Sequence, residues 1–143
     1  MAGEIVVGFD GQEGSDAALR TAVGIAAAFA RPIVLVFGYQ PTSMGGDTGD
    51  LGRAVREIGE GVTAKGVAAA HAIDPSVSVQ VELVNDRPAE ALLRAGDEHD
   101  ALAIVVGSAG RGPIQGGLLG SVTYQVVHRS TRPVVVVPVP EAL

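Results

Sequence analysis

The sequence predicts an α/β fold, a five-stranded parallel sheet with helices on both faces. Apolar segments rich in β-branched residues alternate along the chain with longer segments whose apolar residues recur at helical spacing. Most of the apolar segments are hydrophobic without interruption, which is typical of strands buried on both faces of a parallel sheet. The 143 residues contain no evident repeat or linker, so we expect one domain over residues 1–143.

Five segments have the composition of strands: Glu4–Phe9, Ile33–Phe37, Val77–Val84, Ala101–Val106 and Pro133–Pro138. The third alternates apolar and polar residues, as a half-exposed strand does. The last has proline at both ends. Because proline cannot donate a hydrogen bond to a neighbouring strand, we expect this segment at an edge of the sheet.

Helical spacing follows each of the first four strands. Ser15 is expected to cap the first helix. The second is expected to begin near Asp50, after a surface loop over residues 41–49 that is rich in glycine and hydroxyl side chains. Pro88 favours the first position of the third helix, and the last helix is predicted over Ser121–Arg129.

The composition excludes several classes of function. Without cysteine, the chain has no disulfides, thiolate nucleophiles or cysteine-based metal sites. Its formal charge is −6 and Lys65 is its single lysine, so it lacks the basic surface that binding nucleic acid or an anionic membrane requires. We find no signal peptide and no apolar stretch long enough to span a membrane, and we expect a cytoplasmic protein.

The residues best suited to chemistry lie in a glycine-rich segment between the fourth strand and the last helix. Glycines allow a backbone to approach a phosphate closely, and the free amides at a helix N-terminus favour an anion. Ser121 and Thr123 can add hydroxyl donors, and Arg111 can add a charge-assisted contact. Asp10 follows the first strand, and ligands of such sheets bind beyond the carboxyl ends of the strands.

Ordinary explanations exist for these residues. A chain with 20 glycines often has a glycine-rich loop, Ser121 could be a plain helix cap, and Asp10 could be a plain turn residue. The spacing favours a ligand site. Gly107, Gly110 and Gly120-Ser121 follow the pattern Gly-x2-Gly-x9-Gly-Ser, which arises by chance in a chain of this composition in roughly a few per cent of cases.

This pattern resembles the nucleotide motif of the universal stress protein family, and the resemblance extends along the chain. Asp10-Gly11 followed by Ser15 is similar to the first-strand signature of that family. Pro88–Leu92 is similar to the start of its third helix, and His128–Pro138 is similar to its terminal strand. The family fold is again a five-stranded parallel sheet.

The resemblance implies a stress-response regulatory protein that holds ATP, with Mg2+ bridging the phosphates. It implies that Asp10 contacts the ribose or adenine. The residues implied to border the base and ribose are Gly8, Phe9, Val106 and Gly107, and those implied to surround the phosphates are Gly110, Gly120, Ser121, Val122 and Thr123. It also implies a homodimer formed by pairing of Val134–Val137 with its copy.

The chain departs from the family pattern in a few places. Gly38 stands where ATP-binding members have a valine against adenine, so we expect this wall of the pocket to be weaker or shifted. Gln12 and Asn85-Asp86 also depart from the usual residues, and none of these positions belongs to the phosphate motif.

Catalysis is not expected. The segment has no positioned lysine, general base or water-orienting motif, and the P-loop and Rossmann spacings are absent. His71, His99 and His128 are dispersed, and we expect no metal or catalytic role for them.

Three alternatives stay open: slow ATP hydrolysis as a timer, an interaction module that needs no nucleotide, and an ATP-pyrophosphatase-type enzyme. The last needs a Ser-Gly-Gly loop, which Asp10-Gly11-Gln12 does not supply.

Overall fold

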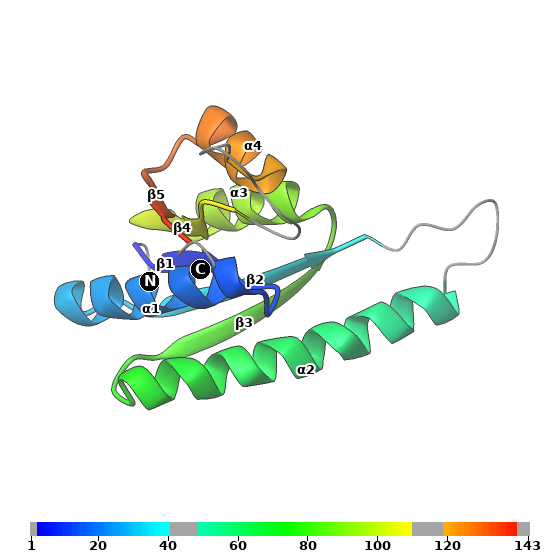
Figure 1. Ribbon diagram of the computed structural model, residues 1–143, viewed down its shortest axis with the longest axis horizontal. Helices are drawn as coiled ribbons and strands as arrows, with labels where there is room; N and C mark the ends of the chain where they lie inside the picture. The colour runs from blue at the N-terminus through cyan, green and yellow to red at the C-terminus, as the bar shows by residue number, and fades with distance from the viewer. Residues whose placement is uncertain (1–2, 41–48, 110–118, 140–143) are drawn as a thin grey trace.

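The computed structural model describes residues 3–40, 49–109 and 119–139, and it confirms the predicted fold class. Five parallel strands form one sheet in the order β3-β2-β1-β4-β5 (Figure 1). The strands are β1 (Ile5–Gly8), β2 (Ile33–Tyr39), β3 (Val79–Asn85), β4 (Ala103–Gly107) and β5 (Val134–Val137). The two edge strands of the described sheet are therefore β3 and β5, and the edge position predicted for the last strand is confirmed.

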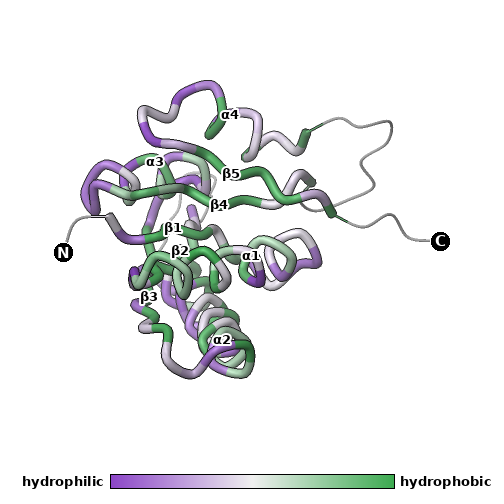
Figure 2. The backbone as a smooth tube through the Cα atoms, turned by 90° about the vertical axis from the view of Figure 1, so that its left-hand side faces the viewer, coloured by the Kyte–Doolittle hydropathy of each residue, from purple (hydrophilic) through white to green (hydrophobic). Residues whose placement is uncertain are grey.

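Two helices cover each face of the sheet (Figure 1). One face is covered by α1 (Glu13–Phe29) and α2 (Gly49–Ile73), and the other by α3 (Pro88–Glu98) and α4 (Ser121–Arg129). Figure 2 shows that most of the strand segments are among the most hydrophobic parts of the chain and that they lie between the helices. This arrangement buries both faces of the central strands, as their uninterrupted apolar sequences predict.

Alternate residues of each strand enter two separate cores. In β1, Ile5 and Val7 pack with Leu19 of α1, whereas Val6 packs with Leu92 of α3. The parallel register places Ile5 beside Ile33 of β2 and beside Ala103 of β4. The alternation matters for function, because it decides which residues at the strand ends face α1 and α2 and which face α3 and α4.

The expected cap of the first helix is wrong. The helix begins at Glu13, so Gln12 is the N-cap residue and Ser15 lies inside the first turn. The Ser15 hydroxyl donates to the carbonyl oxygen of Gln12 over 2.9 Å and accepts the N–H of Gly11 over 3.1 Å. Ser15 thus stabilises the turn that leads into the helix through side-chain bonds to the backbone, and it does not cap the helix.

All five strands differ from their expected bounds, β1 and β5 by only one residue at each end. β2 continues past Phe37 to include Gly38 and Tyr39, because β3 pairs with it along its whole length. β3 begins at Val79, two residues later than expected, and β4 begins at Ala103. The extension of β2 carries its end to the cavity described below.

In the described parts of the chain, no helix is long and apolar enough to cross a membrane.

A histidine bridge ties the end of α3 to the sheet. The Nδ1 atom of His99 lies 2.5 Å from the Oε2 atom of Glu4, and its Nε2 atom lies 2.6 Å from the Oε2 atom of Glu82. Both ring nitrogens can donate only when the ring is doubly protonated. Burial disfavours that charge, but the hydrogen bonds to Glu82 and Glu4 outweigh it, so the pKa of His99 is raised above its ordinary 6.5.

This bridge predicts a pH-dependent stability. Because the folded-state pKa of His99 is raised, the stabilisation is fully present below about pH 6.5 and falls as the pH rises through the folded-state pKa. Replacing His99→Gln is expected to flatten this part of the curve of unfolding free energy against pH, measured by urea denaturation. The control is His71→Gln, which changes an exposed histidine of α2. Equal slopes in the wild type and the His99→Gln variant would contradict the prediction.

Candidate functional site

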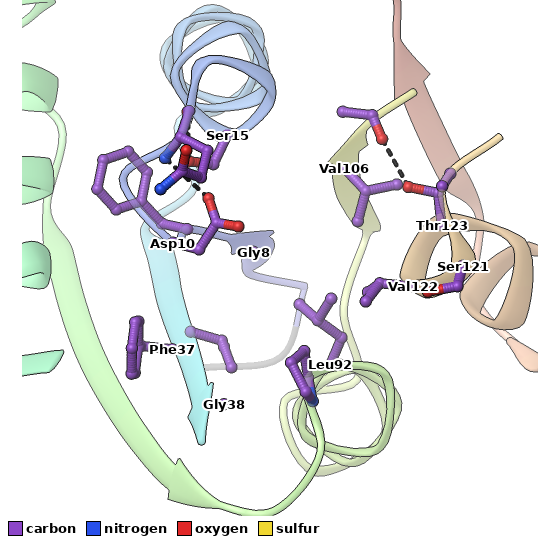
Figure 3. Close-up of a pocket in the computed structure, with 16 residues that line it drawn as sticks. Gly8, Asp10, Ser15, Phe37, Gly38, Leu92, Val106, Ser121, Val122 and Thr123 are labelled. Carbon is purple, nitrogen blue, oxygen red and sulfur yellow. Dashed lines mark hydrogen bonds between the residues drawn. The ribbon is translucent and has the colours of Figure 1, made fainter. Parts of the chain in front are cut away.

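A cavity of about 440 Å3 lies at the carboxyl ends of β1, β2 and β4 (Figure 3). The chain leaves β1 for β2 on one side of it and returns to β4 on the other side, so the cavity lies at the topological switch point of the sheet. The starts of α1, α3 and α4 complete its walls. The positive ends of three helix dipoles therefore surround one cavity, which favours an anionic ligand.

Ten of the residues proposed from the sequence line this cavity: Gly8, Phe9, Asp10, Gly38, Val106, Gly107, Gly120, Ser121, Val122 and Thr123. They come from β1, β2, β4 and α4 or their flanking turns, and the fold brings them together around one cavity. Gly110 and Arg111, the other two proposed residues, lie outside the described residues.

Sequence reasoning missed several wall residues: Gln12, Ser15, Val36, Phe37, Pro88 and Leu92. Phe37 was missed because β2 was expected to end there. Pro88 and Leu92 were assigned to a helix start, and no chemical signal distinguishes them from ordinary helix residues. Only the packing of α3 against the strand ends makes them part of the site.

The first turn of α4 presents free amides to the cavity. Gly120 is the N-cap residue, with φ −62° and ψ 156°, and no side chain caps the helix. The first helical bond runs from the N–H of Tyr124 to the Gly120 carbonyl, so the N–H groups of Ser121, Val122 and Thr123 have no acceptor among the described residues. The N–H of Gly120 itself donates to the Ser108 carbonyl over 3.0 Å and is not available to a ligand.

The two hydroxyl groups expected as ligand donors differ. The Thr123 hydroxyl donates to the carbonyl of Gly107 over 2.6 Å (Figure 3), and its side chain is buried. The expectation that Thr123 donates its hydroxyl to a ligand is therefore wrong, because the proton holds α4 to the end of β4. Ser121 is exposed and its hydroxyl has no partner in the described part of the chain, so it remains available.

Asp10 lies across the cavity from α4 (Figure 3). Its Oδ1 atom accepts the N–H of Gln12 over 2.9 Å, which fixes the turn after β1. Its Oδ2 atom has no partner among the described residues. An exposed carboxylate oxygen held in this way can accept a hydrogen bond from a ligand hydroxyl or amine.

The comparisons with known proteins decide the family. The model of the universal stress protein family matches residues 1–138. The chain belongs to this family. A universal stress protein of Mycobacterium tuberculosis is 33% identical over 132 residues, which cover 92% of this chain and 44% of that protein. The chain thus spans less than half the length of the curated relatives it matches.

Solved universal stress proteins share the fold. One from Archaeoglobus fulgidus is 26% identical, with a TM-score of 0.77 over 96% of this chain and 99% of that one. Another, solved in complex with cAMP, is 29% identical, with a TM-score of 0.76 over 98% of this chain and 100% of that one. The resemblance expected from the motif is confirmed at the level of the family and the fold.

Gly38, where this universal stress protein departs from the expected valine, lies directly against α3. A β-carbon at Gly38 would lie 2.8 Å from the Cα atom of Pro88 and 3.0 Å from the Cβ atom of Ala91. At Gly8, a β-carbon would lie 3.1 Å from the Cδ1 atom of Leu92. The two glycines let α3 approach the sheet, and Pro88 and Leu92 of α3 line the cavity there.

Gly107 of the motif has a packing role. A β-carbon there would lie 2.5 Å from the carbonyl oxygen of Gly14 and 3.0 Å from its Cα atom. Conversely, a β-carbon at Gly14 would overlap the carbonyl oxygen of Ala109. The first turn of α1 and the end of β4 therefore meet backbone to backbone, which sets the width of the cavity between them.

Replacing Gly107→Ala is expected to destabilise the protein by about 1–3 kcal/mol, because the methyl group would force α1 away from β4. The control is Gly24→Ala, since a β-carbon on this exposed glycine of α1 would meet nothing within 4 Å. That substitution is expected to stabilise the helix by about 0.5–1 kcal/mol. Urea denaturation measures both. Equal stabilities of the two variants would contradict the packing role of Gly107.

Proposed function

We propose that this universal stress protein binds an adenine nucleotide in the cavity at the switch point and acts as a stress-response regulatory protein rather than an enzyme. The observation that carries the proposal is the set of amides on Ser121, Val122 and Thr123, which have no acceptor among the described residues and lie at a largely apolar cavity. The cAMP complex of the neighbour that is 29% identical supports the same ligand class.

The two ends of a nucleotide match the two sides of the cavity. The α4 amides and the Ser121 hydroxyl suit a phosphate, since a helix N-terminus needs no cationic side chain to bind an anion. Apolar groups of Phe9, Phe37 and Leu92 suit a base. Asp10 lies where its free oxygen can accept a hydrogen bond from a ribose hydroxyl.

The proposal extends to ATP with Mg2+. Among the described residues, no group of three His, Asp or Glu side chains could hold a metal ion. A magnesium ion would therefore be held mainly by the phosphates and water, which is a common coordination for this ion. The ion would neutralise phosphate charge, and the α4 amides would orient the phosphates.

A regulatory role fits the side chains of the cavity better than catalysis. Asp10 is the only ionisable side chain among the described residues that line it. Its Oδ1 atom is occupied by the Gln12 amide, and the described residues that line the cavity include no second acid or base to move a proton. We therefore propose that the protein signals by whether it has a nucleotide bound and not by hydrolysing it.

The proposal also includes a homodimer through β5. This edge strand has four half-buried valines, and its outer side has no partner in the described sheet. An apolar edge strand of this kind pairs readily with another strand. A module that acts through this surface without nucleotide is the second candidate, favoured by the exposed Tyr124 and Val127 of α4.

Calorimetric titration of nucleotide-free protein with ATP, with and without Mg2+, and with cAMP tests the ligand class. We expect saturable binding with one nucleotide per chain. Absence of binding at millimolar concentrations of all of these would refute the proposed function and favour the second candidate.

Two substitutions at Ser121 distinguish the contribution of its backbone amide to nucleotide binding from that of its hydroxyl. Ser121 is the first helical residue and follows an extended Gly120, the setting that proline tolerates best. Ser121→Ala removes only the hydroxyl and is expected to weaken nucleotide binding by about two- to tenfold. Ser121→Pro also removes the free N–H and is expected to weaken it further, with the unfolding free energy nearly unchanged. Equal affinities of the proline variant and the wild type would exclude the amide contact.

Light scattering at micromolar protein tests the dimer, and we expect about twice the 14.4 kDa chain mass. Val136→Pro removes an N–H that the strand alternation directs to the outer side of β5, so it is expected to shift the mass toward one chain. A single-chain mass for the wild type would refute the dimer without bearing on nucleotide binding.

A further inference from the structure

Ser108 connects three segments of the chain at the end of β4. It is not one of the described residues that line the cavity. Its N–H donates to the carbonyl of Val137 over 2.8 Å, and its carbonyl accepts the N–H of Gly120 over 3.0 Å. Its hydroxyl oxygen accepts the N–H of Val139 over 3.1 Å. One half-buried residue thus holds β4, the end of β5 and the start of α4 together.

The pattern of these bonds departs from a regular parallel ladder. In such a ladder, a residue that donates to one residue of the neighbouring strand accepts, through its carbonyl, the N–H two residues further along that strand. The bonds from Ile104 to Pro133 and from Ser108 to Val137 set this register. The next acceptor for the N–H of Val139 would therefore be the Ser108 carbonyl, but the N–H bonds to the Ser108 hydroxyl instead.

We propose that the Ser108 hydroxyl replaces its own carbonyl in the ladder, so that this carbonyl can hold Gly120 and position the first turn of α4 at the cavity. Ser108 is in this sense a positioning residue for the α4 amides. The ligand that those amides bind rests on the proposed function, whereas the arrangement of Ser108, Gly120 and Val139 does not.

The reason for the exchange is a competition between two donors. Without the hydroxyl, the half-buried N–H of Val139 would lack a partner, and an unsatisfied amide of this kind is costly. The Ser108 carbonyl would then be drawn back to Val139 and would release Gly120. A second anchor, the bond from the Thr123 hydroxyl to the Gly107 carbonyl, would remain, so α4 would loosen at its first turn without detaching.

The test compares Ser108→Ala with Ser108→Thr, which keeps the hydroxyl, in the full chain. The matched control is Ser130→Ala, because the Ser130 hydroxyl also accepts a backbone N–H, that of Arg132 over 2.9 Å, but lies away from the cavity. Amide hydrogen exchange of Gly120 and Val139, measured by NMR without nucleotide, reports the bonds themselves. Titration with ATP and with cAMP reports the consequence for binding.

For Ser108→Ala we expect faster exchange of the Gly120 amide, retained protection of Val139 and about tenfold weaker nucleotide binding. Ser108→Thr and Ser130→Ala should match the wild type in both measurements. Unchanged exchange of Gly120 in Ser108→Ala would overturn the proposal whether or not nucleotide binds. Faster exchange of Gly120 with unchanged affinity would overturn the positioning role. If the wild type bound neither nucleotide, the proposed function would fail, and the Gly120 amide would still decide whether Ser108 holds α4.

Discussion

The contact between the backbones of Gly107 and Gly14 is the constraint on which the candidate site depends. No side chain separates the end of β4 from the first turn of α1, and a β-carbon at either glycine would collide with the other segment. Because interiors are closely packed, a contact of this kind leaves little freedom in the placement of α1. The turn after β1, with Asp10 and Gln12, is therefore held at a defined distance from the end of β4.

The same close packing recurs on the opposite face of the sheet. Gly8 and Gly38 admit α3, whose first turn then becomes a wall of the cavity. Glu90 of that turn forms a bidentate salt bridge with Arg129 of α4, at N–O distances of 2.5 and 3.0 Å. The cavity is thus bounded by three helix starts, and the Glu90–Arg129 pair ties the start of α3 to the last residue of α4.

These helix starts explain how an acidic protein can offer an anion site. The chain has a formal charge of −6, and no cationic side chain lines the described part of the cavity. Backbone amides and helix dipoles provide local positive potential that does not depend on net charge. Such a site favours a ligand with one concentrated anionic group and an apolar body, which is consistent with the nucleotide proposed above.

Sequence alone determined the fold class, the edge position of β5 and most of the candidate site. Uninterrupted apolar runs are sufficient to predict buried parallel strands, and the prolines at 133 and 138 favour an edge. The motif spacing then located the site, because its glycines and Ser121 are close in the sequence.

Tertiary structure decided what depends on contacts between distant segments. His99 meets Glu4, 95 residues away, and no local pattern indicates that pairing. Phe37, Pro88 and Leu92 enter the site only through the packing of α3 and the extension of β2. Likewise, the Thr123 hydroxyl resembles a ligand donor in the sequence, but it donates its hydrogen bond to the carbonyl of Gly107. Periodicity and spacing report local geometry, whereas the partner of a hydrogen bond is chosen by packing.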